Sequence, residues 1–259
     1  AKPVPLPIHE ANDFNLDPEE LARLLTPKTK LVILNSPGNP TGGVMTRAMI
    51  EKVVAALARF PKVLVLTDEI YSRILYEGEH LSIAAWPGMK ERCFILDGFS
   101  KTYAMTGWRL GYGVAKKALV DAMARLATNC HSCPPSFVQI AGIEALQGEQ
   151  ASVASMVREF KRRRDVIVDG LNAIPGFSCR RPNGAFYVFP NIAGTGMSSK
   201  ALADALLDKA GVAGLAGTCF GAGGEGYLRF SYANSVEAIE RGLAGIRKAL
   251  SELRAPAAK

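Results

Sequence analysis

The sequence has no long hydrophobic run, and no apolar stretch approaches the ~20 residues that a membrane-spanning helix needs. Its first residues also lack the charged-then-apolar pattern of an export signal. Hydrophobic residues make up 48% of the chain and charged residues 21%, which is typical of a globular protein in water. We therefore expect a soluble, cytoplasmic protein with no membrane partner.

Cysteine is scarce: the 259 residues contain five cysteines, which are odd in number and scattered. This usage predicts a reducing compartment and no disulfide scaffold. Cys130 and Cys133 have the Cys-x-x-Cys spacing of half a zinc site, but no second pair supplies the remaining ligands. The sequence therefore predicts no metal site.

Acidic residues are fewer than basic ones, which gives a net charge of +7 and a pI near 9.2. The densest basic cluster, residues 161–164, is a candidate nucleic-acid patch. However, apolar residues recur at helical spacing from 153 to 171, and residues 161–163 fall mostly off that stripe. Because no aromatic residues interleave for base stacking, we interpret the cluster as a solvated helix face. We expect no nucleic-acid partner, and only a mild attraction for anionic substrates.

The first half of the chain alternates apolar strands with amphipathic helices. One helix is predicted to begin after Asp17, with Asp17 as its N-cap and Pro18 at its first position. Further helices are predicted at residues 46–59, 116–127 and 137–146, and strands at 31–34, 63–67, 93–96 and 110–114. Strands that are apolar throughout are typical of parallel sheets buried on both faces. We therefore predict an α/β fold with a mostly parallel sheet and helices on both of its faces.

The second half of the chain has a different texture, which begins with a long helix predicted at about 150–171. Aromatic-rich strands are predicted at 186–189 and 227–231, and helices at 199–209 and 236–253. This pattern predicts two domains: a large domain at residues 1–149 and a small α+β domain at residues 150–259. The long helix joins the two.

One lysine stands out in residues 98–111, which read GFSKTYAMTGWRLG. Lys101 follows the strand predicted at 93–96, and open α/β sheets bind ligands at such strand ends. A lone lysine is most often a solvated loop residue. The alternative is a desolvated amine that forms a Schiff base with a carbonyl cofactor. Arg109 follows eight residues later, and its guanidinium can bind phosphate.

Three other short segments carry polar residues at turns or strand ends. Residues 39–42 read NPTG, residues 68–71 read DEIY, and residues 227–231 read YLRFS. Singly, each segment has a simple structural interpretation: a turn, a helix cap, or an arginine in a surface ion pair. Their occurrence in this order, together with the lysine segment, favours a shared functional role over these separate structural interpretations.

Together the four segments resemble those of the pyridoxal-phosphate-dependent aminotransferases of classes I and II, a fold-type I family that includes aspartate aminotransferase. The resemblance implies that Lys101 forms the Schiff base with pyridoxal 5′-phosphate and that Arg109 binds the cofactor phosphate. It also makes Ser100 a cofactor-binding residue. The large domain, residues 1–149, is then the cofactor-binding domain.

The resemblance implies roles for the remaining polar residues. Asp68 would keep the cofactor's ring nitrogen protonated, because an anionic partner raises the pKa of that nitrogen. Tyr71 and Asn39 would donate hydrogen bonds to the cofactor's phenolate oxygen. Arg229, together with Asn39, would bind the substrate, with the arginine fork on the α-carboxylate. Lys101, Asp68 and Tyr71 are thus the expected catalytic residues.

The implied reaction is the transfer of an amino group between an L-amino acid and a 2-oxo acid, and the implied assembly is a homodimer. Two alternatives stay open: a lyase that uses the same cofactor for β-elimination, and a catalytically incomplete fragment. Residues 39–42 correspond to the family's asparagine turn. The family's phosphate-binding turn and ring-stacking aromatic residue precede that turn, and neither occurs in the 38 residues before Asn39. The chain therefore resembles the C-terminal two-thirds of such an enzyme.

Overall fold

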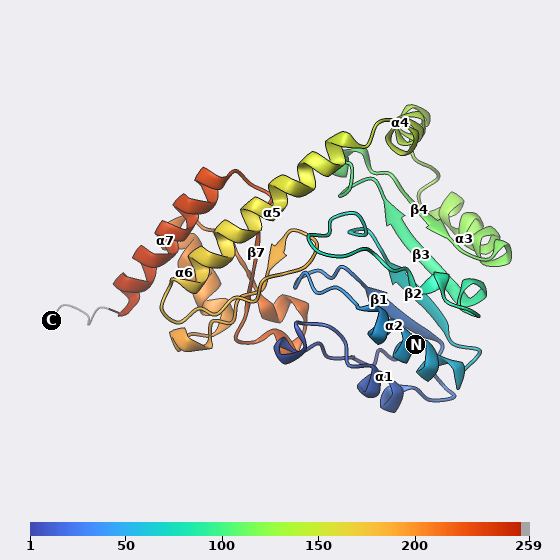
Figure 1. Ribbon diagram of the computed structural model, residues 1–259, viewed down its shortest axis with the longest axis horizontal. Coiled ribbons are helices and arrows are strands. Elements are labelled where there is room, and N and C mark those ends of the chain that lie inside the picture. Colours follow the sequence, from blue (N-terminus) through green and yellow to red (C-terminus); the bar gives the residue numbers. More distant parts are fainter. Residues whose placement is uncertain (255–259) are drawn as a thin grey trace. The chain divides into compact units, whose positions relative to one another are not determined.

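The computed structural model describes residues 1–254, which form two compact units (Figure 1). The first unit comprises Ala1–Gly38 and Gly43–Ser155. The second unit comprises Asn39–Gly42 and the described residues from Met156 onward. The short segment Asn39–Gly42 therefore belongs to the second unit, although the chain on either side of it belongs to the first.

A four-stranded sheet with the order β1-β2-β3-β4 forms the centre of the first unit. Its strands are β1 (Leu31–Asn35), β2 (Leu64–Asp68), β3 (Cys93–Gly98) and β4 (Gly111–Val114). β1, β2 and β3 are parallel, whereas β4 is antiparallel to β3. The sheet is therefore mostly parallel, as predicted. The register pairs Asn35 with Asp68 and Asp68 with Leu96. The C-terminal ends of the three parallel strands therefore lie at the same end of the sheet.

The helices of the first unit begin close to their predicted positions. They are α1 (Pro18–Leu24), α2 (Arg47–Ala58), α3 (Lys117–Cys130) and α4 (Ser136–Gln147). Asp17 caps α1 by accepting from the backbone N–H of Glu19, and Thr46 caps α2 by accepting from that of Met49. α1 and α2 lie side by side (Figure 1). α3 continues to Cys130, three residues beyond the predicted end, so this cysteine belongs to a helix and not to the break that follows.

One face of α2 packs against the sheet and forms the core of the first unit. Ile50, Val53 and Leu57 recur at helical spacing, are almost fully buried, and share one cluster with Val32 and Val65 of the strands. The residues that alternate with these along β1 and β2 are partly exposed: Leu31, Ile33 and Leu64. These strands are apolar on both faces, as predicted, and this chain covers them on one face.

The second unit contains a small antiparallel sheet with the order β5-β7-β6. Its elements are β5 (Tyr187–Val188), β6 (Leu215–Ala216), β7 (Leu228–Ser231), α6 (Ser199–Ala210), α7 (Val236–Arg254) and most of α5 (Ala151–Asn172). The aromatic-rich segments predicted as strands pair with each other as β5 and β7. α6 packs on α7, and Leu202, Leu206 and Leu228 are completely buried in the core.

The basic cluster at residues 161–164 lies on α5 and differs from its prediction at one position. Arg162 and Arg163 both donate to the carboxylate of Glu159, in the manner of a solvated helix face. Arg164, in contrast, is buried, and its Nη1 donates to the carbonyl oxygen of Pro182 at 3.2 Å. The interpretation of the whole cluster as solvated was therefore wrong for Arg164, because a backbone carbonyl satisfies its guanidinium inside the second unit.

Within residues 1–254, no helix is both long enough and apolar enough to cross a membrane. In the same part of the chain, no group of three or more His, Cys, Asp and Glu side chains is placed to hold a metal ion. All five cysteines are free thiols.

Arg92, directly before β3, satisfies the carbonyl groups at the C-terminal end of α2. Its Nε donates to the carbonyl oxygen of Val63 at 2.8 Å, and its Nη1 and Nη2 donate to those of Leu57 and Phe60 at 3.2 and 2.7 Å. Carbonyl groups in the last turn of a helix have no partner within the helix. One side chain thus connects the end of α2, the start of β2 and the start of β3.

We predict that Arg92→Ala lowers the free energy of unfolding by on the order of 2–3 kcal/mol, because it removes charged donors from three carbonyl groups. Urea denaturation followed by circular dichroism measures this loss. Lys62→Ala, which removes an exposed cation from the same region, is the control and should change stability by less than about 0.5 kcal/mol. Equal losses in the two variants would contradict the assignment.

Candidate active site

The first unit contains Asp68, Tyr71, Ser100, Lys101 and Arg109, the predicted cofactor-binding residues other than Asn39. Asp68 is the last residue of β2, and Tyr71 lies in the turn that follows it. Ser100 and Lys101 follow β3, and Arg109 precedes β4. We call residues 68–71 the aspartate turn and residues 99–110, between β3 and β4, the lysine loop. Because β2 and β3 are parallel neighbours, the structure brings both segments to the same end of the sheet.

Asp68 is a partly buried carboxylate at this end. Its Oδ1 accepts from the backbone N–H of Ile70 at 3.2 Å, and its carbonyl oxygen accepts from the side chain of Asn35 at 3.1 Å. Burial raises the pKa of Asp68; the hydrogen bond from Ile70 opposes this rise, and the charge of Glu69 adds to it. Within residues 1–254 no cationic side chain pairs with Asp68. A protonated ring nitrogen is a group that fits this carboxylate.

The turn after β2 is closed by backbone hydrogen bonds. The N–H of Ser72 donates to the carbonyl oxygen of Glu69 at 2.7 Å, and that of Ile74 donates to Tyr71 at 2.8 Å. Tyr71 itself is 3% exposed, so the body of its ring is held in the core of the first unit. The turn therefore fixes the position of Tyr71 relative to Asp68, three residues before it.

The lysine loop is a tight connection between β3 and β4. Gly98 pairs with Gly111, and a Cβ atom on Gly98 would lie 2.8 Å from the Cα atom of Gly111, so this approach requires glycine. Inside the loop, the hydroxyl of Thr106 donates to the carbonyl oxygen of Ser100 at 2.9 Å. The N–H of Ala104 donates to the carbonyl oxygen of Lys101 at 3.2 Å. These bonds hold the half-buried Lys101 in a defined position after β3.

Arg109 has an unusual backbone conformation and an almost unused guanidinium. Its φ is +54°, in the left-handed region that non-glycine residues rarely adopt, and such strain is concentrated at functional positions. One nitrogen donates to the carbonyl oxygen of Thr106 at 2.9 Å. Among the described residues no carboxylate pairs with Arg109. Its remaining donors fit a phosphate group.

The second unit contains Asn39 and Arg229, which the fold brings together although 190 positions separate them. Nη1 of Arg229 donates to Oδ1 of Asn39 at 3.2 Å. The asparagine turn is attached to this unit through Gly42, whose carbonyl oxygen accepts from the N–H groups of Asn183 and Gly184. A Cβ atom on Gly42 would collide with Pro182, so the close approach depends on glycine.

Aromatic rings surround the guanidinium of Arg229. It lies 4.6 Å from the ring centroid of Tyr187 and 5.2 Å from that of Phe220, within cation–π range. Its Nε is buried and has no hydrogen-bond partner among the described residues. A buried donor without an acceptor is costly, and a carboxylate from a ligand would satisfy it. Sequence reasoning found Arg229 but missed both aromatic residues, because nothing in their spacing indicates contact with it.

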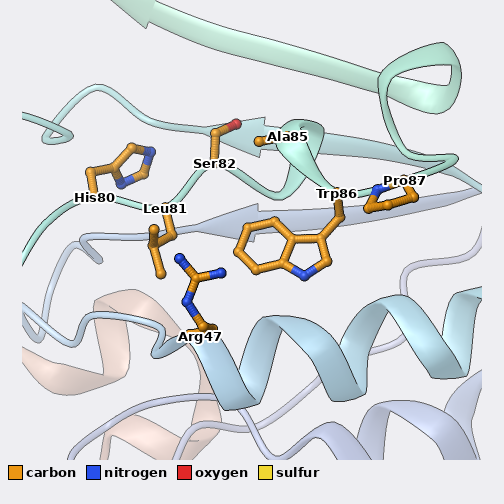
Figure 2. Close-up of a pocket in the computed structure, with 7 residues that line it drawn as sticks. All are labelled: Arg47, His80, Leu81, Ser82, Ala85, Trp86 and Pro87. Carbon is orange, nitrogen blue, oxygen red and sulfur yellow. The ribbon is translucent and has the colours of Figure 1, made fainter.

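Sequence reasoning also missed a polar network around Glu69, the residue that follows Asp68. Glu69 accepts hydrogen bonds from His80 and Ser82, which line a cavity of about 290 Å³. Figure 2 shows Arg47, at the start of α2, reaching across this cavity toward Leu81 and the ring of Trp86. None of the predicted site residues lines the cavity. Its link to the site is Glu69, the neighbour of Asp68.

Comparisons with known proteins agree with the resemblance. The family model described as aminotransferase class I and II matches residues 1–246. Aromatic-amino-acid aminotransferase 2 of Thermococcus litoralis is 41% identical over 97% of this chain and 65% of its own length. Aspartate aminotransferase of Pyrococcus horikoshii is 42% identical over 96% of this chain and 64% of its own length. The chain thus spans slightly less than two thirds of these curated relatives.

Solved structures give the same result for the fold. A crystal structure of an aromatic aminotransferase from Pyrococcus horikoshii superposes with a TM-score of 0.94 and 39% identity, over 98% of this chain and 68% of the other. An aspartate aminotransferase from Rhizobium meliloti superposes with a TM-score of 0.89 and 37% identity, over 94% and 63%. The predicted α/β fold class is confirmed.

We predict that Asp68→Asn stabilises the chain at neutral pH in the absence of cofactor. Burial raises the folded-state pKa of Asp68, so the stability of the parent falls as pH rises from the unfolded-state pKa, about 3.9, through the folded-state value. Asparagine keeps the acceptor for Ile70 and removes the charge. The gain should therefore be present at pH 7 and vanish below about pH 4.

Thermal unfolding of parent and variant across this pH range measures the effect. Asp208→Asn, which neutralises an exposed carboxylate on α6, is the matched control and should show no such pH-dependent gain. An Asp68→Asn variant that is less stable than the parent at pH 7 would show that the carboxylate acts as a structural cap.

Proposed function

The chain belongs to the aminotransferase class I and II family, and on this premise we propose that the protein containing it transfers an amino group between an L-amino acid and a 2-oxo acid, with pyridoxal 5′-phosphate as cofactor. The observation that carries the proposal is the placement of Lys101 and Asp68 at the same end of two paired parallel strands. Because the chain spans less than two thirds of its curated relatives, the activity is proposed for the whole protein.

We assign each part of the cofactor to residues whose chemistry fits it. Lys101 would hold the aldehyde carbon, Ser100 and Arg109 would hold the phosphate, and Asp68 would pair with the ring nitrogen. The hydroxyl of Tyr71 donates to the phenolate oxygen. The free donors of Arg109 and the unpaired carboxylate of Asp68 support this assignment. When bound, the cofactor supplies an electron sink for the Cα–H bond of the substrate.

The residues of the chain then perform the remaining tasks. Asp68 stabilises positive charge on the ring nitrogen, because an ionised carboxylate favours the protonated form of a basic partner. Tyr71 stabilises negative charge on the phenolate oxygen by hydrogen bonding. Once substrate had replaced it, Lys101 would be a free amine whose Nζ can accept the proton that leaves the substrate's α-carbon.

Arg229 is proposed to bind the substrate's α-carboxylate, with Asn39 beside it. The buried Nε without an acceptor supports this role, as do the donors that Arg229 keeps available next to the Asn39 oxygen. The rings of Tyr187 and Phe220 both lie within cation–π range of its guanidinium. The predicted hydrogen bond from Asn39 to the phenolate oxygen, the domain division between residues 149 and 150, the homodimer and the cytoplasmic location stay predictions.

We predict that Lys101 is the lysine that binds the cofactor covalently. The protein containing this chain should develop an absorbance near the visible edge when pyridoxal phosphate is added. Borohydride reduction followed by peptide mapping should then place the label on Lys101, and Lys101→Arg should abolish both the absorbance and the label. A label on another lysine would contradict the assignment. Formation of 2-oxo acid without amino transfer to an acceptor would instead indicate the lyase.

We predict that Arg229→Ala lowers kcat/KM for amino acid substrates by on the order of 100-fold or more, because it removes one partner of a buried charge-assisted pair. Arg247→Ala, which removes an exposed arginine from α7, is the matched control and should leave kcat/KM unchanged. Steady-state kinetics with several amino donors measures the effect. If Arg229→Ala and Arg247→Ala behave alike, the substrate carboxylate binds elsewhere.

A further inference from the structure

Glu69, directly after Asp68, is a buried carboxylate that the proposed function does not use. The residue is 5% exposed, and every polar contact of its side chain lies within the first unit. Its Oε1 accepts from the hydroxyl groups of Ser82 and Thr67 at 2.7 and 3.1 Å. Its Oε2 lies 2.8 Å from Nε2 of His80. Both carboxylate oxygens are therefore occupied by donors.

The backbone of Glu69 is held as firmly as its side chain. Its N–H donates to the carbonyl oxygen of Leu96 on β3 at 2.8 Å, which extends the pairing of β2 with β3 by one residue. Its carbonyl oxygen accepts from the N–H of Ser72 at 2.7 Å and closes the turn that contains Tyr71. Glu69 thus connects Asp68 on one side with the turn of Tyr71 on the other.

His80 supplies the ionic partner of this carboxylate. Its side chain is 18% exposed against 7% for Glu69, and within residues 1–254 it is the one ion-pair partner that Glu69 has. It lines the cavity of Figure 2, where the guanidinium of Arg47 lies 5.5 Å from the ring centroid of Trp86. The cavity places one side of His80 next to solvent.

The charge of Glu69 matters because other acidic groups surround it. Burial would raise the pKa of Glu69, but the hydrogen bonds from His80 and Ser82 outweigh it and hold that pKa low. The resulting negative charge helps to raise the pKa values of neighbouring groups from β2, β3 and β4; they are Asp68, Cys93, Asp97 and Tyr112. His80 acts in the opposite direction on Asp97.

We propose that Glu69 and His80 form a positioning pair for the candidate active site: Glu69 fixes the turn that contains Asp68 and Tyr71, and the His80 ring holds Oε2 of Glu69 and, when it is protonated, offsets the Glu69 charge beside Asp68. Without the imidazolium, an unpaired carboxylate next to Asp68 opposes its ionisation. The purpose of the pair rests on the proposed function, since Asp68 needs to be ionised to hold a protonated ring nitrogen. The existence of the pair does not, because its contacts are a property of the chain.

The electrostatic part of the proposal is tested without cofactor, by carbon-13 NMR titration of the Asp68 carboxyl group in this chain. His80→Gln keeps a donor for Glu69 but removes the positive charge of the protonated ring, so the charge of Glu69 is no longer offset and the pKa of Asp68 should rise. Glu69→Gln removes the like charge and should lower that pKa. The double variant removes both charges and should return the Asp68 pKa to near the parent value.

An Asp68 pKa that returns to the parent value in the double variant shows that the pair acts through its charges. If the pair acted only through packing, a second substitution would not restore that pKa. Glu79→Gln, which neutralises an exposed carboxylate beside His80, is the matched control and should leave the Asp68 pKa unchanged. If His80→Gln does not fold, Glu69→Gln still decides, since an Asp68 pKa that does not fall overturns the proposal. So does a double variant that resembles His80→Gln.

The positioning part is tested by amide hydrogen exchange at Ser72, whose N–H donates to Glu69. Glu69→Ala should increase exchange there at least tenfold, whereas Glu69→Gln, which keeps one oxygen as acceptor for Ser82 and Thr67, should increase it less. Equal exchange in the two variants overturns this part.

These experiments distinguish the pair from the function. If the Asp68 titrations follow the expected pattern but Lys101 takes no label from the cofactor, the proposed function fails and the pair stands. If Lys101 is labelled and His80→Gln does not change the Asp68 pKa, the pair fails and the function stands.

Discussion

The parallel pairing of β2 with β3 is the constraint on which the candidate site depends. It places Asp68 opposite Leu96, so that the aspartate turn and the lysine loop leave the sheet at the same end. The antiparallel return of β4 then brings Arg109 back toward Lys101, with Gly98 against Gly111 at the neck of the loop. Backbone hydrogen bonding thus sets the geometry, and the side chains at these positions supply the chemistry.

The same pairing concentrates negative charge at one end of the sheet. Asp68 ends β2, Glu69 follows it, and Asp97 lies near the end of the neighbouring strand β3. Burial raises the pKa values of Asp68 and Asp97. An empty site of this kind is less stable than a neutral one, and a cationic ligand recovers the difference on binding. Glu69 is the exception, because His80, Ser82 and Thr67 satisfy its carboxylate. The arrangement leaves Asp68 as the acidic group available to a cation.

In the second unit, the guanidinium of Arg229 also keeps a donor without a partner among the described residues. Arg229 lies within cation–π range of Tyr187 and Phe220 and contacts Asn39, while its Nε has no acceptor among the described residues. Aromatic faces stabilise a guanidinium without consuming its donors, so the fork stays available to an anion. In each unit, a side chain that can carry charge thus keeps part of its hydrogen-bonding capacity unused, as the proposed function requires.

Local sequence indicated the strands other than β6, the helix caps of α1 and α2, and the candidate site residues. Apolar strand patterns, Asp17 and Thr46 as caps, and the spacing of Lys101 to Arg109 are short-range features that a reader of the sequence can see. Only the tertiary structure decided which distant residues meet. The contact of Asn39 with Arg229 spans 190 positions, the rings of Tyr187 and Phe220 reach Arg229 through sheet pairing and loop packing, and His80 reaches Glu69 through a loop. Arg164 looked solvated because its partner, the carbonyl oxygen of Pro182, comes from another part of the chain. Hydrogen bonding and burial between distant segments leave no periodic trace in a sequence, so they could be found only once the chain was folded.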